Sequence, residues 1–164
     1  MTPHAGPAWT VWLEASAAAV AMRQWAWLYP IVEISHILGF VFVIGAAAMF
    51  DLRLLGLSRR LPVDAMARHL LPWSWAGLAL VVPSGTLMFV AHATEWYDNP
   101  AFRLKLALLA AAGLNALVFN RGAFQKIAGW NEGAGAPVTA RVAAVASLLL
   151  WAAVIACGRL LAYL

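Results

Sequence analysis

The sequence predicts an all-α protein: a four-helix transmembrane bundle with a short N-terminal interfacial helix. Of its 164 residues, 64% are hydrophobic and only 11% are charged, and the mean hydropathy is +0.80. Soluble domains average roughly 25% charged residues and are under half apolar. In addition, four apolar runs are each long enough to cross about 30 Å of hydrocarbon as a helix. No run alternates polar and apolar residues, which argues against strands.

The N-terminal part, residues 1–27, is predicted to be a tail with one interfacial helix. Its stretch AWTVWLEASAAAVAMRQWAW is too polar to span a membrane but rich in Ala and Trp, which favours a helix on the membrane surface. A cleaved signal peptide is not expected, because the first basic residue is Arg23 and Glu14 interrupts the early apolar residues. Residues 28–164 form the predicted transmembrane domain.

Four spans are predicted, over residues 28–52, 69–93, 101–120 and 138–161. Pro30 lies in the first turn of the first span, where its missing N–H costs nothing. Pro83 lies in the middle of the second span, where it predicts a kink. The connections read GLSRRLPVDAMAR, TEWYDNP and RGAFQKIAGWNEGAGAP. Four spans place both termini on the same side of the membrane.

The distribution of basic residues orients the bundle. Seven lie in or beside the first and third loops and four lie on the other side: Arg53, Arg59, Arg60, Arg68, Arg121, Lys126 and Arg141 against Arg23, Arg103, Lys105 and Arg159. The positive-inside rule therefore places these loops in the cytoplasm and both termini outside. Arg103 and Lys105 are expected to reach the outer headgroups. Because the basic residues are scattered along the edges of apolar runs, the lipid bilayer and not nucleic acid is the expected anionic partner.

Ionisable side chains within the first span should face other helices, because a charge at the bilayer centre costs about 3 kcal/mol. At 100° per residue, Glu33 and Asp51 lie on nearly one line of this helix, and His36 lies about 60° from it. We therefore predict that all three face the interior of the bundle. A structural polar network is predicted from Glu33, Arg159, Asp51, Arg53 and His69, with Glu33 paired to Arg159.

His36 is the leading candidate for a cofactor ligand, about 12 Å from the outer end of the first span. A b-type haem needs one or two axial nitrogen or sulfur ligands, which facing helices of a bundle can supply. His92, near the outer end of the second span, or Met88, one turn deeper, is the predicted second ligand. The alternative is a buried imidazole that is hydrogen-bonded to a neighbouring helix or to Glu33.

A metal site is a second interpretation of the same region. The segments EISH and HATE each place a carboxylate and an imidazole on one helical face, and the four residues Glu33, His36, His92 and Glu95 could hold Zn, Cu or Fe. Such short patterns also arise by chance. The alternatives are an ion pair for Glu33 and a solvated loop position for Glu95.

Other classes of function have no sequence support. The hydrolase, transferase and nucleotide-binding motifs that we sought are missing. The single cysteine, Cys157, cannot form an intrachain disulfide. At most a redox role, by electron transfer, remains open among enzymatic activities.

Five segments resemble a family of uncharacterised bacterial four-helix membrane proteins: WLYPIVEISHILG, DLRLLGLSRRLP, RHLLPWSWAGLAL, NPAFRLKLALLAAAGLNALVFNRG and GRLLAYL. More distantly, FRLKLALLAAAGLNALVFNR resembles a helix of copper-resistance-D-like proteins, and that group is similar in layout to membrane b-type cytochromes. The resemblance implies a compact bundle in the bacterial inner membrane and haem or copper handling, and with the orientation predicted from the basic residues both termini are then expected in the periplasm. In that family a histidine often occupies the position of Asn120. If that histidine is a ligand in the relatives, a ligand site at the inner side of the membrane that needs it is not expected in this chain.

Three functional hypotheses follow. The leading one is a membrane protein that binds haem b through His36 and exchanges electrons with quinone or a redox partner protein. The second is a component of metal (copper) or small-solute transport. The third is a cofactor-free structural or assembly subunit. The sequence leaves open whether copies of the chain associate.

Overall fold

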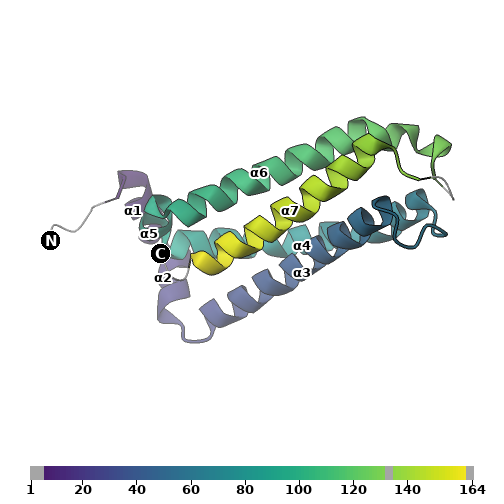
Figure 1. The fold of residues 1–164 in the computed structure, drawn as a ribbon. Helices are drawn as coiled ribbons and strands as arrows, with labels where there is room; N and C mark the ends of the chain where they lie inside the picture. The colour runs from purple at the N-terminus through teal and green to yellow at the C-terminus, as the bar shows by residue number, and fades with distance from the viewer. Residues whose placement is uncertain (1–5, 132–134, 162–164) are drawn as a thin grey trace.

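The computed structural model describes residues 6–131 and 135–161, and the regular elements in these ranges are helices. In chain order they are α1 (Ala8–Glu14), α2 (Ala17–Gln24), α3 (Leu28–Leu54), α4 (Val63–Ala91), α5 (Ala93–Asp98), α6 (Pro100–Arg121), the 3-10 helix η1 (Ala123–Gly129) and α7 (Val138–Leu160) (Figure 1). The predicted all-α fold is confirmed.

The four long helices α3, α4, α6 and α7 coincide with the four predicted spans. Each contains an 18-residue window of mean hydropathy between 1.6 and 2.1, and at most 22% of any of these windows is buried within the chain. Apolar surface on this scale needs a nonpolar surrounding, because exposure to water costs roughly 25 cal/mol per Å². The chain is therefore a multi-pass membrane protein.

Local sequence signals set the ends of the spans. The Asn99 side-chain oxygen accepts hydrogen bonds from the backbone N–H groups of Ala101 (2.9 Å) and Phe102 (3.3 Å), and Pro100 occupies the first turn of α6. Helix α4 begins at Val63, six residues before the predicted start of its span, directly after Pro62. Its first two turns are polar, so hydropathy alone did not reveal them.

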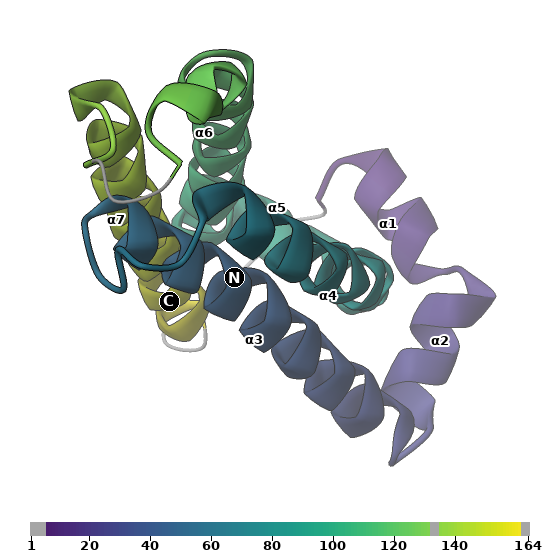
Figure 2. The same ribbon diagram turned by 90° about the vertical axis from the view of Figure 1, so that its right-hand side faces the viewer.

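The N-terminal segment forms two short helices instead of the single predicted one. The Ser16 hydroxyl accepts a hydrogen bond from the Ala19 N–H (3.3 Å) and starts α2 after the chain has turned away from α1. Thr10, Ala19 and Met22 are buried, because α1 packs on α5 and α4 while α2 packs on α4 (Figure 2). These helices cover one end of the bundle.

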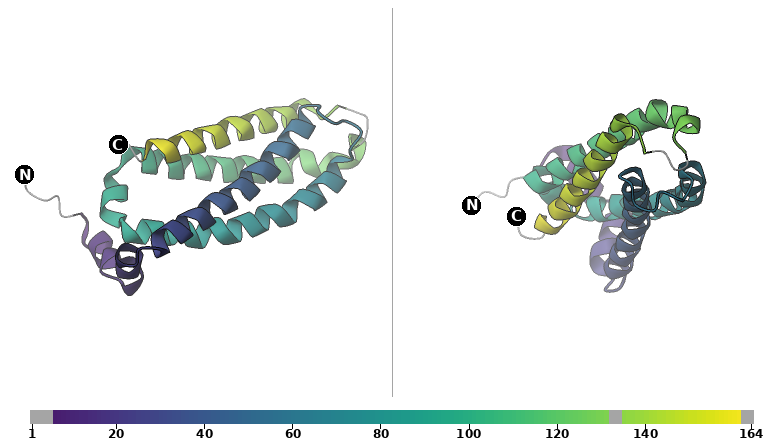
Figure 3. Two further views of the ribbon diagram at one scale, coloured as in Figure 1. Left: turned by 90° about the horizontal axis from the view of Figure 1, so that it is seen from below. Right: turned by 45° about the vertical axis from the view of Figure 1, so that its right-hand side comes forward.

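The four spans form two helical hairpins. Helix α3 packs along α4 and α6 packs along α7, and the contact between α3 and α7 joins the two pairs. Helices α4 and α6 are not a closely packed pair, although the rings of Phe89 and Phe102 stack near one end (5.3 Å between centroids). We call the end that carries α1, α2 and α5 the terminal end, and the end with residues 55–62 and η1 the loop end (Figures 1 and 3).

Two glycines allow α3 and α4 to approach each other closely. A Cβ atom on Gly39 would lie 2.8 Å from the Gly77 carbonyl oxygen, and one on Gly77 would lie 2.6 Å from the Gly39 carbonyl oxygen. Small residues at helix crossings let the backbones approach and gain van der Waals contact within the bilayer. This crossing lies three residues from His36 along α3.

At the loop end, Arg53 is 2% exposed and ties three segments together. Its Nε donates to the carbonyl of Leu61 (2.7 Å), and its Nη2 donates to the carbonyls of Arg59 (3.1 Å) and Asn131 (3.4 Å). The end of α3, the α3–α4 loop and the segment after η1 are thereby fixed to one side chain.

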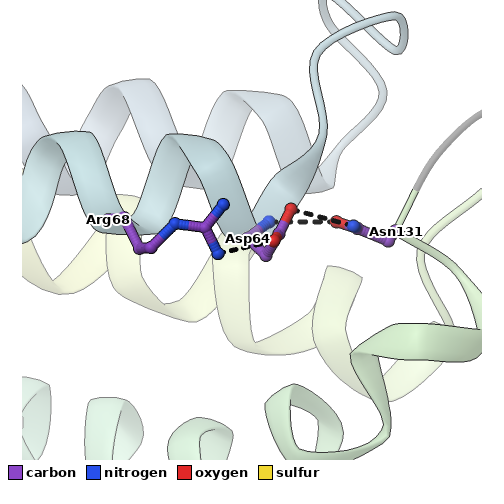
Figure 4. Close-up of polar contacts among 3 residues, drawn as sticks. All are labelled: Asp64, Arg68 and Asn131. Carbon is purple, nitrogen blue, oxygen red and sulfur yellow. Dashed lines mark hydrogen bonds and ion pairs between the residues drawn. The ribbon is translucent and has the colours of Figure 1, made fainter.

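A second set of contacts connects the start of α4 to the same segment. The Asn131 amide donates to the Asp64 carboxylate (2.8 Å), its side-chain oxygen accepts from the Asp64 N–H (3.0 Å), and Arg68 forms an ion pair with the other carboxylate oxygen (2.6 Å) (Figure 4). The Asp64 carboxylate also lies in the first turn of α4, where negative charge is favourable.

Candidate functional site

The imidazole of His36 on α3 is held by Ser84 on α4. The His36 Nδ1 lies 3.0 Å from the Ser84 Oγ, and this Oγ also lies 2.5 Å from the carbonyl oxygen of Leu80 and 3.2 Å from that of Val81. The hydroxyl has one proton, which it donates to these carbonyls, so its Oγ accepts from His36 Nδ1–H. We assign the tautomer from this network. It leaves His36 Nε2 with a lone pair.

An aromatic ring lies beside this imidazole, and a tryptophan and a lysine lie against that ring in turn. The ring of Phe40 stacks beside that of His36 (6.1 Å between centroids), and Trp151 on α7 meets Phe40 edge to face (6.1 Å). The Lys105 Nζ on α6 lies 5.8 Å from the centroid of Phe40, within cation–π range. We call His36, Ser84, Phe40, Lys105 and Trp151 the four-helix centre, because each of the four spans supplies at least one of them.

Gly85 makes room for the imidazole, whereas a Cβ at Gly158 would be in ordinary van der Waals contact with Lys105. A Cβ on Gly85 of α4 would lie 3.0 Å from the Cε1 of His36, and one on Gly158 of α7 would lie 3.7 Å from the Nζ of Lys105. The imidazole therefore sits against bare backbone of α4. A larger residue at position 85 would push the ring out of its place.

The position of Lys105 corrects the expectation that it reaches the outer headgroups. Its amine lies over the Phe40 ring inside the bundle, whereas Arg103, two residues earlier, is exposed. The sequence contains a signal for this: Lys105 lies four residues after Ala101 and seven before Ala112, the buried positions of α6. These spacings put Lys105 on the inward stripe of the helix.

The two predicted partners of His36 lie elsewhere in the fold. His92 follows the last residue of α4, between the rings of Tyr29 (5.6 Å) and Trp96 (5.9 Å), and its buried Nδ1 has no hydrogen-bond partner among the described residues. It lies eight residues beyond Ser84, about 12 Å along the helix. Met88 packs against the small core of Met22, Val32 and Ala91. Neither side chain is seen to approach His36 in these contacts.

The acidic candidates are less enclosed. Glu33 and Glu95 are exposed, and among the described residues no group of three or more His, Cys, Asp or Glu side chains is placed to hold a metal ion. The inward orientation predicted for Glu33 is not found. Glu33 lies one turn into α3, at the terminal end, where α2 and α4 are the helices that flank α3.

The predicted polar network is divided between places. Asp51 is buried beside Ser147 of α7, and its Oδ2 has no hydrogen-bond partner among the described residues. Arg53 points to backbone carbonyls at the loop end, and His69 is exposed. Asp51 and Arg53 are two positions apart, about 200° around the helix, so their side chains point toward different neighbours. The pairing of Glu33 with Arg159 stays a prediction.

A family model described as "Family of unknown function (DUF6644)" matches residues 9–164. No curated protein and no solved structure matches the chain. The match includes α1 and α2 as well as the four spans, so the helices that cover the terminal end are part of the domain that the family shares. The looser resemblance to copper-resistance-D-like proteins and membrane b-type cytochromes stays a prediction.

Proposed function

The chain belongs to DUF6644, a family of unknown function, and we propose that it is a membrane electron-transfer protein that binds haem b through His36. The observation that carries the proposal is the hydrogen bond between His36 Nδ1 and Ser84 Oγ (3.0 Å). Histidines that ligate metals generally donate their other ring N–H to a fixed acceptor, which sets the tautomer and the ring orientation. His36 has this arrangement, because Nδ1–H is bonded to Ser84 and the lone pair on Nε2 is left to bind a metal.

The residues of the four-helix centre suit such a ligand in three ways. Ser84 orients the imidazole, Phe40 stacks beside it with Trp151 against its edge, and the Lys105 amine lies over the Phe40 ring. Haem would supply reversible one-electron chemistry at its iron. A second axial ligand is not provided by the observed positions of Met88 and His92, so the proposal needs His36 as the only protein ligand.

Absorption spectra test this proposal directly. The chain is produced with haem supplementation, purified in detergent and examined oxidised and then dithionite-reduced, with iron measured in the same sample. We expect a Soret band that His36→Gln abolishes and that His69→Gln, a change at an exposed histidine of α4, leaves intact. Wild-type protein with neither a Soret band nor iron would eliminate the haem proposal.

A second candidate is a binding site for a quinone head group, and the placement of Lys105 favours it. A quinone has a flat ring that can stack on aromatic side chains and two carbonyl oxygens that accept hydrogen bonds. Phe40 and Trp151 offer ring faces and edges, and Lys105 offers N–H donors beside them. Calorimetric titration with a short-chain ubiquinone should then show binding that Lys105→Met removes and that Arg103→Met preserves.

The remaining hypotheses are distinguished by the same samples. Copper at one equivalent per chain, lost in His36→Gln, would favour a role in copper handling or transport over haem. If His36→Gln changes neither metal content, spectrum nor quinone binding, the imidazole has a structural role, as in an assembly subunit whose polar residues hold the bundle together.

A further inference from the structure

Three arginines line a small cavity at the loop end, far from the four-helix centre. The cavity has a volume of about 40 Å³ and lies between the end of α3, the α3–α4 loop and the start of α7, with Arg53, Arg59 and Arg141 in its wall. This volume accommodates a group of a few water-sized atoms. Among the described residues none of these three arginines forms an ion pair with a carboxylate, and Arg68, which does, is not part of this wall.

Backbone carbonyls hold one of these arginines in place, and a second lies over the α3–α4 turn. The guanidinium of Arg53 is anchored by three carbonyl oxygens and is almost fully buried. The guanidinium of Arg59 folds back over Gly56, where a Cβ atom would lie 2.9 Å from its Nη2. Gly56 also has φ +111°, a left-handed conformation that favours glycine. The buried Arg53 therefore gives the cavity wall a fixed positive charge, and the exposed Arg59 lies over the turn beside it.

An apolar groove continues from the cavity along α7. It has a volume of about 560 Å³ and shares Leu55 and Arg141 with the cavity wall. The rest of its lining is apolar and follows one face of α7, with four residues at helical spacing: Val138, Val142, Val145 and Leu149. From the first to the last of these is about 16 Å along the helix, close to the thickness of one leaflet of a ~30 Å hydrocarbon core.

We propose that the loop end binds one anionic phospholipid, with its phosphate at Arg53, Arg59 and Arg141 and one acyl chain in the groove on α7. Guanidinium groups bind phosphate oxygens through paired N–H donors. Basic pockets between spans at the cytoplasmic side are suited to anionic head groups. A free phosphate ion would share the head-group chemistry but would leave the groove empty, so the groove assigns the site to a lipid.

Native mass spectrometry of the full chain, released from detergent with added lipids, tests the proposal. We expect phosphatidylglycerol to bind more tightly than phosphatidylcholine of the same acyl chains. Arg59→Gln and Arg141→Gln should each weaken phosphatidylglycerol binding roughly fivefold, since each basic contact with an anionic membrane contributes about that much. Arg121→Gln, at an exposed arginine of the loop end outside the cavity wall, is the matched control. Arg53 is left unchanged because it also holds the loops.

A groove variant and a competitor separate a lipid from a phosphate ion. Ala146→Phe, which places a larger side chain in the groove five residues beyond Arg141, should weaken phosphatidylglycerol binding, and millimolar inorganic phosphate should displace little of it. Equal binding of the two lipids, or equal effects of Arg141→Gln and Arg121→Gln, would overturn the proposal. Full retention of binding in Ala146→Phe together with displacement by phosphate would show a phosphate site only.

Discussion

At the scale of single residues, the hydrogen bond between His36 and Ser84 joins the two most extensively packed helices. Ser35, one position before His36, uses its hydroxyl differently, because it donates only to the Ile31 carbonyl of its own helix (2.8 Å). Both serine hydroxyls donate to a carbonyl one turn earlier, but only the Ser84 oxygen also accepts a hydrogen bond from another helix. This contrast separates an interhelical bond from a local one.

We predict that Ser84→Ala lowers the free energy of unfolding by about 1 kcal/mol, because the half-buried His36 loses the acceptor of its N–H. Thermal unfolding in detergent, followed by circular dichroism, measures the change. Ser35→Ala is the control and should be nearly neutral. Equal effects of the two substitutions would mean that the interhelical bond contributes no stability.

A larger loss of stability is predicted when Arg53 is replaced. Replacing it with Gln removes a buried guanidinium that donates to three carbonyls, and should cost about 3 kcal/mol of unfolding free energy. Arg60→Gln, at an exposed position in the same loop, should leave the unfolding temperature unchanged. A wild-type-like unfolding temperature for Arg53→Gln would contradict the role assigned to this side chain.

Residue orientation could be predicted only in part. The helical wheel predicted that Asp51 faces inward, and it is buried. The same wheel put Glu33 on that line, yet Glu33 is exposed, because a wheel does not show where along a helix the neighbours are. The expectation that Lys105 reaches the outer headgroups is wrong, because its amine lies over the Phe40 ring. Its spacing from Ala101 and Ala112 was the better guide.

At the scale of elements, the close crossing of α3 and α4 depends on Gly39 and Gly77. We predict that Gly77→Ala lowers stability by about 1–3 kcal/mol, because its Cβ would lie 2.6 Å from a backbone oxygen that cannot move without shifting a helix. Thermal unfolding in detergent gives the measurement.

The matched control for this crossing is Gly45→Ala on α3, where an added Cβ would meet nothing within 4 Å. Alanine favours a helix over glycine, so this variant should be neutral or slightly more stable. If both alanine variants behave alike, the proximity of the two backbones is not important for stability.

The existence of the elements followed from hydropathy more directly than their ends did. All four predicted spans are present, because a run of apolar residues long enough to cross hydrocarbon has few other uses. The start of α4 at Val63 and the break at Ser16 between α1 and α2 depend on capping and on tertiary packing. Hydropathy reports on burial in lipid and contains little information on helix capping or on tertiary packing.

At the scale of the whole molecule, the charge balance between the two ends becomes clearer once side-chain positions are known. The sequence assigns seven basic residues to the loop end and four to the terminal end. One basic residue at each end is turned inward, Arg53 and Lys105. Six basic residues then remain for the loop end and three for the terminal end. The loop end still has the excess of basic residues, and the ratio of basic residues between the two ends is larger.

We therefore predict that the loop end is cytoplasmic and that the chain ends in the periplasm. Alkaline phosphatase, which is active only in the periplasm, should be active when fused after the last residue and inactive when fused after Asn131 in the α6–α7 connection. A green fluorescent protein fused at the same two points should give the opposite pattern. Reversed activities would require the opposite orientation, and would place the three-arginine cavity in the outer leaflet.

The two-hairpin arrangement has a consequence for the order of events during synthesis. The glycine crossing and the His36–Ser84 bond involve only α3 and α4, which are synthesised before α6. Lys105 and Trp151 arrive only with the second hairpin, which joins the first through α3 and α7. A nascent chain stalled after α5 thus possesses the imidazole without its cation or its indole, and the full set of side chains around Phe40 exists only once α6 and α7 have been made and have docked.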